Sequence, residues 1–366
     1  DGDTVTLSGF VANGIAEALN AAAEERFLET GHPKDLTLFW VAGTGNKDGS
    51  HADHYAHEGM VKKVIGGHFN FVPKICEMLS ENKIEGYNVP QGAIAQMLRD
   101  NAAHKVGTIS HVGIGTFADP RNGGGRLSEK TKEDIVKVIE LEGQEQLFYP
   151  RIPLDVAFIR GTYADELGNI TLEKEMAPLD ATSQAMAVHN NGGLVVVQVE
   201  RVVKAGHLDP KLVKIPGIYV DAVVECPADD PKQSQSINCT YDPAYAGNTQ
   251  VPVSSLEPKK LDAKKIIGRR AAMELKKNVV VNLGVGVPEW VSSVAAEEGV
   301  ADEMTLTVEC GPVGGVPGGG LRFGGSVNAQ AYMDEGYQFD FYDGGGLDLC
   351  FLGLAEVDNN GDVNVS

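Results

Sequence analysis

Residues 266–299 read IIGRRAAMELKKNVVVNLGVGVPEWVSSVAAEEG, and this stretch carries the pattern that decides the fold. A helical pattern comes first, followed by a short apolar run, a glycine turn and an Ala- and Glu-rich helix. Residues 1–27, DGDTVTLSGFVANGIAEALNAAAEERF, repeat the order of strand, glycine turn and helix. The two stretches match in pattern and not in identity. They predict two related α/β domains.

Further apolar runs alternate with helical patterns along the chain. They are DLTLFWVAG (35–43), LDVAFIRGTYAD (154–165), GGLVVVQVERVV (192–203) and IPGIYVDAVVEC (215–226). Near-continuous apolar strands separated by helices are typical of parallel sheets covered on both faces. The prediction is an α/β fold with two related, open, mostly parallel sheets. Ligands of such sheets bind beyond the carboxyl ends of the strands, which places Gly9, Gly14, Gly284 and Gly286 at the rim of a site.

The composition changes once along the chain. Residues 227–265 are rich in Asp, Pro, Gln, Ser, Asn and Lys and have little periodicity, so we interpret them as a linker. The predicted domains are therefore residues 1–226 and residues 266–366. The chain starts without Met and stops inside a strand pattern, which indicates a piece of a longer protein truncated at both ends.

Charge and cysteine content narrow the class of protein. The chain has 31 Lys and Arg against 51 Asp and Glu, a formal net charge of −20, which disfavours nucleic acid and anionic membranes as partners. A few local cations can still hold an anionic small molecule. Five scattered Cys without a CxxC pair are typical of reduced thiols, and no run is apolar enough to span a membrane. We expect a cytoplasmic protein.

Several common motifs are missing or incomplete. The stretch GVGVPEW lacks the third glycine of a dinucleotide-binding fingerprint, and neither a Walker A loop nor a GxSxG elbow occurs. His51, His54 and His57 follow one another at intervals of three, as some metal ligands do. A structural or surface role is the favoured interpretation, and we predict no metal site.

Glycine clusters remain to be explained. One is TVECGPVGGVPGGGLRFGGS (307–326), in which Glu309 is the single acidic residue, and the others are GIGTFADPRNGGGR (113–126) and YDGGGLDLCFLG (342–353). Dense glycine weakens helices and strands, so it indicates tight turns or close approach of the backbone to a ligand.

These clusters belong to a longer ordered set of motifs. The set is SGFVANG, YNVPQGAIAQMLRD, GIGTFADPRNGGG, IRGTYADELGNIT, VNLGVGVPEWV, TVECGPVGGVPGGGLRFG and FDFYDGGGLDLCFLGLAEVD. Over essentially the whole chain it resembles the family I coenzyme A transferases. The resemblance is strongest to the propionate, lactate and acetate CoA-transferases whose two halves are fused in one chain.

The resemblance implies that Glu309 is the catalytic nucleophile. Its carboxylate would attack an acyl-CoA thioester, pass through an acyl-glutamyl anhydride and hold CoA as a glutamyl thioester before a second carboxylic acid reverses the steps. This ping-pong scheme needs no metal, nicotinamide or ATP. It makes coenzyme A a substrate and covalent intermediate, with no tightly bound cofactor.

The resemblance implies roles for further residues. Gln91 and Gly92 would serve the oxyanion site, although a polar residue also suits the start of a helix. Gly344, Gly345 and Gly346 would line the CoA channel, although a glycine turn can equally serve a sheet edge. The acyl pocket would be formed by Ser8, Phe10, Ala12 and Asn13. The family takes another oxyanion donor from a segment beyond Ser366.

The favoured function is CoA transfer between a short-chain acyl-CoA and a carboxylic acid by a homo-oligomeric enzyme. The acyl group stays open among acetate, propionate, lactate and butyrate. One alternative is an acyl-CoA hydrolase on the same fold, in which water resolves the anhydride. The other is a non-enzymatic domain that senses a small molecule or binds a sugar phosphate.

Overall fold

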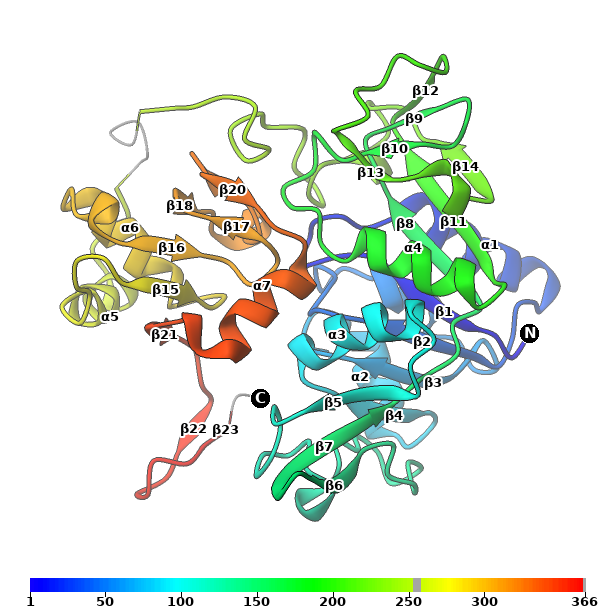
Figure 1. Cartoon of the computed structure of the whole chain (residues 1–366), viewed down its shortest axis with the longest axis horizontal. Coiled ribbons are helices and arrows are strands. Elements are labelled where there is room, and N and C mark those ends of the chain that lie inside the picture. The colour runs from blue at the N-terminus through cyan, green and yellow to red at the C-terminus, as the bar shows by residue number, and fades with distance from the viewer. Residues whose placement is uncertain (253–257, 365–366) are drawn as a thin grey trace. The chain divides into compact units, whose positions relative to one another are not determined.

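A computed structural model describes residues 1–252 and 258–364, which fall into two compact units. Unit 1 comprises Asp1–Glu173 and Leu179–Thr240, and unit 2 comprises Lys174–Pro178 and Tyr241–Ser366. Figure 1 shows unit 1 in blue to green and most of unit 2 in yellow to red. Residues 174–178 belong to unit 2, although the residues on both sides of them in sequence belong to unit 1. The domain bounds expected from the sequence stay a prediction.

Unit 1 is built on a seven-stranded sheet in which every neighbouring pair is parallel. In spatial order its strands are β14 (Ala222–Glu225), β11 (Leu194–Val199), β8 (Val156–Arg160), β1 (Thr4–Leu7), β2 (Leu36–Trp40), β3 (Val61–Gly66) and β4 (Glu85–Asn88). The central strands are Val-, Leu- and Phe-rich, and all five residues of β2 are buried. Burial on both faces is what a parallel sheet requires, so the predicted α/β class is confirmed.

Helices cover both faces of this sheet. Val5 and Leu7 point to the face where α1 (Glu17–Thr30), η1 (His51–Tyr55) and α2 (Pro73–Ser80) complete one apolar core. Thr6 alternates to the other face and accepts a hydrogen bond from Gln184 of α4 (Ala181–Asn190). There α4 packs beside α3 (Gln91–Ala102), and Figure 1 shows the pair in front of the sheet.

The ends of these helices follow from local chemistry. Helix α1 begins at Glu17, an acidic residue that suits the positive end of the helix dipole. It ends at Gly31, which takes a left-handed conformation and donates its N–H to the Phe27 carbonyl at 2.7 Å. At α2, Pro73 occupies the first turn and the Asp53 carboxylate accepts the Ile75 N–H at 3.1 Å.

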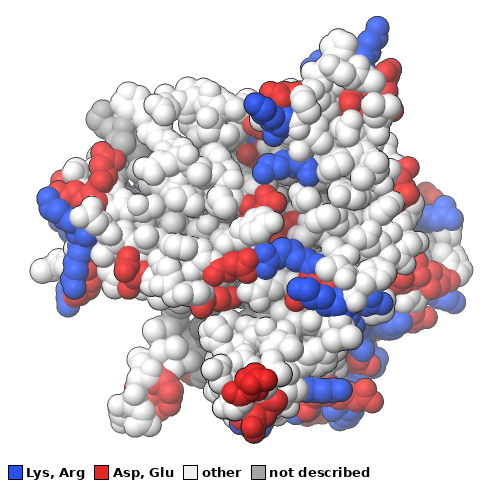
Figure 2. Space-filling view, in the orientation of Figure 1, with Lys and Arg blue, Asp and Glu red and all other residues white. Residues whose placement is uncertain are grey.

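Two smaller sheets complete unit 1. One has the order β12 (Arg201–Val203), β9 (Tyr163–Asp165), β10 (Ile170–Thr171) and β13 (Val213–Ile215), and the other has β5 (Gly107–Ser110), β7 (Gln144–Pro150) and β6 (Lys137–Leu141). Short 3₁₀ helices lie at η2 (Pro120–Asn122), η3 (Gly217–Tyr219) and η4 (Pro231–Gln233). Figure 2 shows acidic side chains gathered over the β6–β7 hairpin, where Glu140, Glu142 and Glu145 are exposed. That charge disfavours a polyanionic partner at this hairpin.

Unit 2 holds a five-stranded sheet with a parallel centre. Its order is β20 (Ala331–Tyr332), β17 (Pro312–Val313), β16 (Thr305–Thr307), β15 (Val280–Leu283) and β21 (Leu349–Phe351), and β15 is parallel to both β16 and β21. The remaining elements are α5 (Ala263–Ala272), α6 (Glu289–Glu297), η6 (Ala301–Glu303), β18 (Val316–Pro317), η7 (Gly320–Arg322), β19 (Ser326–Val327), α7 (Glu335–Phe341), η8 (Tyr342–Gly346), β22 (Glu356–Val357) and β23 (Val363–Asn364). The order helix, strand, glycine turn, helix predicted for residues 266–299 is present as α5, β15 and α6.

Part of the predicted linker is well packed within unit 1. Gln233, Gln235 and Ser236 are buried. The backbone carbonyls of Gln233 and Ser234 accept hydrogen bonds from the buried Arg160 guanidinium. Polar composition predicted a linker, but these residues are buried and two of their carbonyls accept hydrogen bonds from Arg160. Residues 253–257 of the predicted linker lie outside the described residues.

The histidine series joins η1 to α1 through two carboxylates. His54 faces Glu17 at 2.7 Å through Nε2 and Glu24 at 2.5 Å through Nδ1, and His57 faces Glu24 at 2.7 Å. A neutral imidazole has one N–H and one lone pair, so a ring placed between two carboxylates must be an imidazolium. Burial alone would lower the pKa of His54, but the hydrogen bonds and charges of Glu17 and Glu24 raise it overall.

This linkage predicts a loss of local stability at alkaline pH. A raised folded-state pKa stabilises the protein below the ordinary pKa of about 6.5. The stabilisation disappears as the pH rises through the folded value, because the imidazolium then loses its proton. Near pH 6, we expect His54→Gln to speed hydrogen exchange of the α1 amides by about tenfold or more, the equivalent of a lost charged hydrogen bond. The difference from wild type should shrink toward about pH 9. His104→Gln is the matched control, since His104 contacts a backbone carbonyl and no carboxylate. Equal differences at both pH values would contradict the imidazolium assignment.

Candidate active site

Glu309 lies in a tight turn at the carboxyl end of a parallel strand. Strand β16 ends at Thr307, and β17 starts at Pro312 and runs antiparallel to it. The turn between them is closed by the Gly311 N–H, which donates to the Val308 carbonyl at 3.0 Å. The carboxyl edge of the sheet is where ligands of α/β folds bind. The location therefore agrees with the role expected for Glu309.

Gly311 explains part of the glycine content that follows Glu309. Its φ is +133°, and a Cβ built on it would lie 2.1 Å from the backbone oxygen of Met333. The Met333 N–H donates to the Gly311 carbonyl at 2.9 Å, so the two backbone segments are held together at this point. No residue with a side chain fits here without moving the backbone.

The carboxylate of Glu309 has one polar side-chain partner. The Asn282 amide, on the neighbouring strand β15, donates from Nδ2 to Oε2 of Glu309 at 3.1 Å. Burial raises the pKa of the Glu309 carboxyl above its ordinary value, and the hydrogen bonds from its own backbone N–H and from Asn282 act in the opposite direction. The result is a partly desolvated carboxylate held by neutral donors.

A second set of polar groups lies behind Asn282. The Tyr342 hydroxyl donates to Oγ1 of Thr307 at 2.6 Å and accepts the Gln338 amide at 2.9 Å. Nδ2 of Asn282 lies 3.4 Å from the same Tyr342 oxygen. Burial raises the pKa of Tyr342 to about 12, so this phenol stays protonated at neutral pH. The predicted glycines Gly344, Gly345 and Gly346 follow directly in the same turn, η8.

The predicted oxyanion residues Gln91 and Gly92 open helix α3 in unit 1. Pro90 precedes them, and Gly92 is buried in the first turn. Gly67, just after β3, lets this helix approach the sheet, since a Cβ there would lie 2.1 Å from the Val41 oxygen and 3.3 Å from the Gln91 Cα. Gln91 thus stands at a helix N-terminus above the carboxyl end of a parallel strand, where backbone N–H groups favour negative charge.

The predicted acyl-pocket residues lie in the loop after β1. Ser8, Phe10, Ala12 and Asn13 are all buried. The loop is closed by its own hydrogen bonds, from the Ser8 hydroxyl to the Gly14 carbonyl at 2.7 Å and from the Asn13 amide to the Phe10 carbonyl at 3.2 Å. Of the four residues, Ala12 lines a pocket of about 190 Å³ in unit 1, together with Ile15, Glu17, Asp48, Ser50, Arg160, Pro231, Lys232, Ser234, Ile237 and Asn238.

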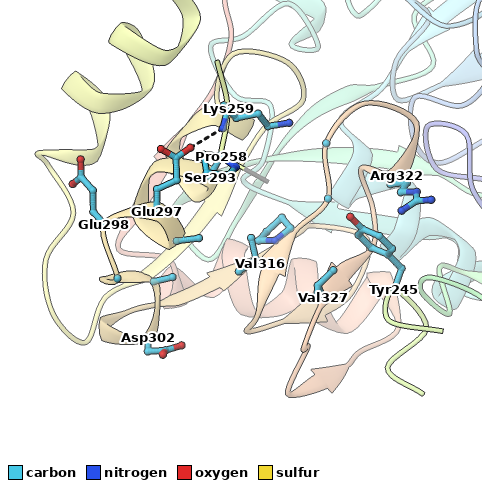
Figure 3. A pocket seen from close by; sticks show the side chains of 16 residues that line it. Tyr245, Pro258, Lys259, Ser293, Glu297, Glu298, Asp302, Val316, Arg322 and Val327 are labelled. Carbon is cyan, nitrogen blue, oxygen red and sulfur yellow. Dashed lines mark hydrogen bonds between the residues drawn. The ribbon is translucent and has the colours of Figure 1, made fainter. Parts of the chain in front are cut away.

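Another pocket, of about 990 Å³, lies within unit 2. In Figure 3, Lys259 and Glu297 stand at one end of it, joined by a hydrogen bond from the Lys259 N–H, and Tyr245 and Arg322 stand at the other. Its lining includes none of the residues expected at the active site. We therefore assign the candidate site to the Glu309 turn and not to the larger hollow.

Sequence reasoning missed Asn282, Thr307, Gln338 and Tyr342. Three of them lie inside motifs that carry the family resemblance, in VNLGVG, TVECG and FYDGGG, so the signal was present. Nothing in the sequence pattern, however, indicates that the Asn282 amide faces Glu309 and Tyr342, which lie 27 and 60 positions further along the chain. Among the described residues, no group of three His, Cys, Asp or Glu side chains is arranged to hold a metal. Nor does any helix within these residues combine the length and apolar character of a bilayer span.

Comparison with known proteins identifies the family. A model of the coenzyme A transferase family matches residues 1–226. The chain is 44% identical to the acetate CoA-transferase YdiF of Escherichia coli K12 over 367 residues, which cover 99% of this chain and 68% of that protein. It is 42% identical to the caffeate CoA-transferase of Acetobacterium woodii, covering 100% of this chain and 70% of that protein. The crystal structure of the E. coli O157:H7 acyl-CoA transferase YdiF as a thioester complex with CoA superposes with a TM-score of 0.92 and 41% identity, covering 100% of this chain and 68% of that one.

The chain belongs to the coenzyme A transferase family. Its reaction class is the transfer of CoA between an acyl-CoA and a carboxylate, with CoA as a substrate. The resemblance deduced from the glycine-rich motifs is confirmed, and so is the predicted enzyme class.

Proposed function

We propose that this chain carries out CoA transfer through Glu309 and that it acts on short-chain acyl groups. The observation that supports this most directly is the half-buried carboxylate of Glu309 at the carboxyl end of β16, held through one oxygen by Asn282. Within the described residues, no other side chain donates a hydrogen bond to it. A carboxylate with reduced hydration suits attack on a thioester carbonyl.

The reaction balances without an external acid, base or metal. A carboxylate oxygen of Glu309 forms a C–O bond to the acyl carbon as the C–S bond breaks, giving an anhydride and CoA thiolate. The thiolate then attacks the glutamyl carbonyl, and the first carboxylate leaves with the electron pair of the C–O bond. A second carboxylate reverses both steps, so the thioester is conserved and no tightly bound cofactor is needed.

Oxyanions form twice in each half-reaction and need donors in place. The amide of Gln91 and the backbone N–H groups at the start of α3 are our candidates for one of these donors, as the resemblance implies. Gly344, Gly345 and Gly346 form the predicted contact with the pantetheine arm, and Gly344 and Gly345 are exposed. These roles stay proposals, as do the homo-oligomeric state and the cytoplasmic location.

The candidate acyl pocket is small. The pocket beside Ala12 has a volume of about 190 Å³, below the roughly 300–1,000 Å³ of sites that take drug-sized ligands. We propose that this pocket takes the acyl group, as a chain of two to four carbons. We expect acetate to accept CoA at least about tenfold faster than caffeate does.

A single incubation tests the proposal. With acetyl-CoA and no acceptor acid, we expect one equivalent of acetate and no continuing release of free CoA, because CoA stays on the enzyme as a glutamyl thioester. Borohydride trapping and peptide mass spectrometry should place the modification on the peptide containing Glu309. Adding propionate should then release propionyl-CoA.

Three outcomes would overturn the proposal or part of it. Label on Cys310, the neighbouring buried thiol, would remove the glutamyl mechanism. Steady release of CoA into water without acceptor would identify the hydrolase alternative. Neither acetate formation nor covalent CoA would favour a binding domain without catalysis.

A further inference from the structure

Hydrogen-bond directions near Glu309 are set by a backbone carbonyl. The Val281 oxygen can only accept, so the Thr307 hydroxyl must donate its proton to it, at 2.9 Å. Oγ1 of Thr307 must then accept from Tyr342, at 2.6 Å. The single proton of the Tyr342 hydroxyl is thereby used, and its oxygen can only accept further bonds.

This direction decides how Asn282 is oriented. The Tyr342 oxygen faces the amides of Gln338 and Asn282, so both must present NH₂ and not their carbonyl oxygen. Asn282 therefore turns its Nδ2 toward Tyr342 and toward Oε2 of Glu309. A flipped amide would set its oxygen against a carboxylate oxygen and against an oxygen without a free proton. The chain of bonds thus excludes the orientation that would repel Glu309.

The four residues are brought together from separate elements. Asn282 and Thr307 are register partners on β15 and β16, Gln338 comes from α7, and Tyr342 opens η8. Within the described residues Glu309 has no ion-pair partner, so Asn282 is the side chain that restrains its carboxylate. The Asn282 amide acts on Oε2. The backbone N–H of Glu309 also donates to the carboxylate, and no other described residue does.

We propose that Asn282 is a positioning residue for the nucleophile and that Tyr342, through Thr307, keeps its amide in the productive orientation. The inference rests on the proposed role of Glu309 and assigns a different role to each of its two carboxylate oxygens. Oε2 is held by Asn282, and Oε1 is the atom that attacks the thioester carbon. Holding the carboxylate in one rotamer aligns it for both half-reactions.

The central test measures both half-reactions in the intact enzyme. For Asn282→Ala, we expect kcat/KM for acyl-CoA and for the acceptor acid to fall together by about 10- to 100-fold. The affinity for free CoA, measured by calorimetry, should stay within about twofold of wild type, because Asn282 is proposed to act on the nucleophile. For Tyr342→Phe, we expect a smaller loss of about tenfold, since the amide can then rotate.

The pH profile supplies a readout that a purely structural role would not move. The Asn282 donor favours the ionised carboxylate, so its removal raises the pKa of Glu309 further. The acid limb of the kcat/KM profile should therefore shift to higher pH in Asn282→Ala and, to a smaller extent, in Tyr342→Phe. Tyr332→Phe is the matched control. It also removes a tyrosine hydroxyl bonded to a backbone carbonyl in unit 2, at 3.1 Å from the Tyr245 oxygen, and should leave the acid limb in place.

A double-mutant cycle tests whether Tyr342 acts through Asn282. If it does, the double variant should be no slower than Asn282→Ala alone, and additive losses would show that Tyr342 acts independently. If Asn282→Ala does not fold, Thr307→Val tests the same chain, since it removes the acceptor of the Tyr342 proton.

The inference and the proposed function fail in different ways. Wild-type rates and an unmoved acid limb in Asn282→Ala, with Glu309→Ala inactive, would overturn the positioning role alone. Full exchange by Glu309→Ala would overturn the proposed nucleophile, whatever Asn282 does.

Discussion

Replacing Glu309 by Ala should leave no CoA transfer above background, and Glu309→Asp should be slower than wild type by about a hundredfold or more. The Asp variant keeps the charge but withdraws the oxygen by roughly 1 Å, and misplacement of about 1 Å can cost on the order of 10²-fold when catalysis depends on alignment. The shorter side chain also moves away from the Asn282 amide, now 3.1 Å from Oε2. Steady-state rates with acetyl-CoA and propionate measure both losses.

The expected order of rates is wild type, then Asp, then Ala. Glu303→Ala is the control, since Glu303 lies in the same unit in an ion pair with Lys277 and is remote from the proposed chemistry. CoA affinity should change little in both Glu309 variants. An Ala variant that keeps even about a tenth of wild-type exchange would require a mechanism built on another group.

Replacing Gly311 by Ala should have the largest effect on folding. The added Cβ would lie 2.1 Å from the Met333 backbone oxygen, at a φ of +133° that side chains rarely adopt. The turn must move or the hydrogen bond from Met333 must break, and we expect a loss of about 3 to 5 kcal/mol in the free energy of unfolding of unit 2. Hydrogen exchange of β16 and β17 amides measures this loss directly. Because the turn carries Glu309, CoA transfer should fall with it.

Gly320→Ala separates the steric clash of an added Cβ from the cost of a positive φ. Gly320 belongs to the same glycine-rich stretch and has a φ of +62°, but no atom lies within 4 Å of the position of its added Cβ. We expect this variant to lose only about 1 kcal/mol, the cost of the left-handed conformation alone. Equal losses in the two variants would mean that backbone conformation, and not close approach of the chain, explains the glycine at 311.

Local pattern was sufficient for much of this protein. Apolar β-branched runs predicted β1, β2, β8 and β11, because a strand buried on both faces must be apolar along its whole length. The predicted strand over residues 215–226 was less accurate, since residues 217–219 form the 3₁₀ turn η3 and β14 begins only at Ala222. Pro216 and Gly217 favour that turn over a continuous strand.

Motif order alone led to the family and to Glu309 as the proposed nucleophile, because the motif around it is a turn in which the backbone geometry requires glycine at position 311. Which groups contact the Glu309 carboxylate was decided by the tertiary structure. Asn282, Thr307, Gln338 and Tyr342 are ordinary polar residues in their own segments. They form one hydrogen-bond network only because β15 pairs with β16 and because α7 leads into η8, which places Tyr342 beside these strands. Hydrogen bonds need donors and acceptors within about 3 Å, and a distance of that kind between residues far apart in sequence is set by packing and not by any local pattern.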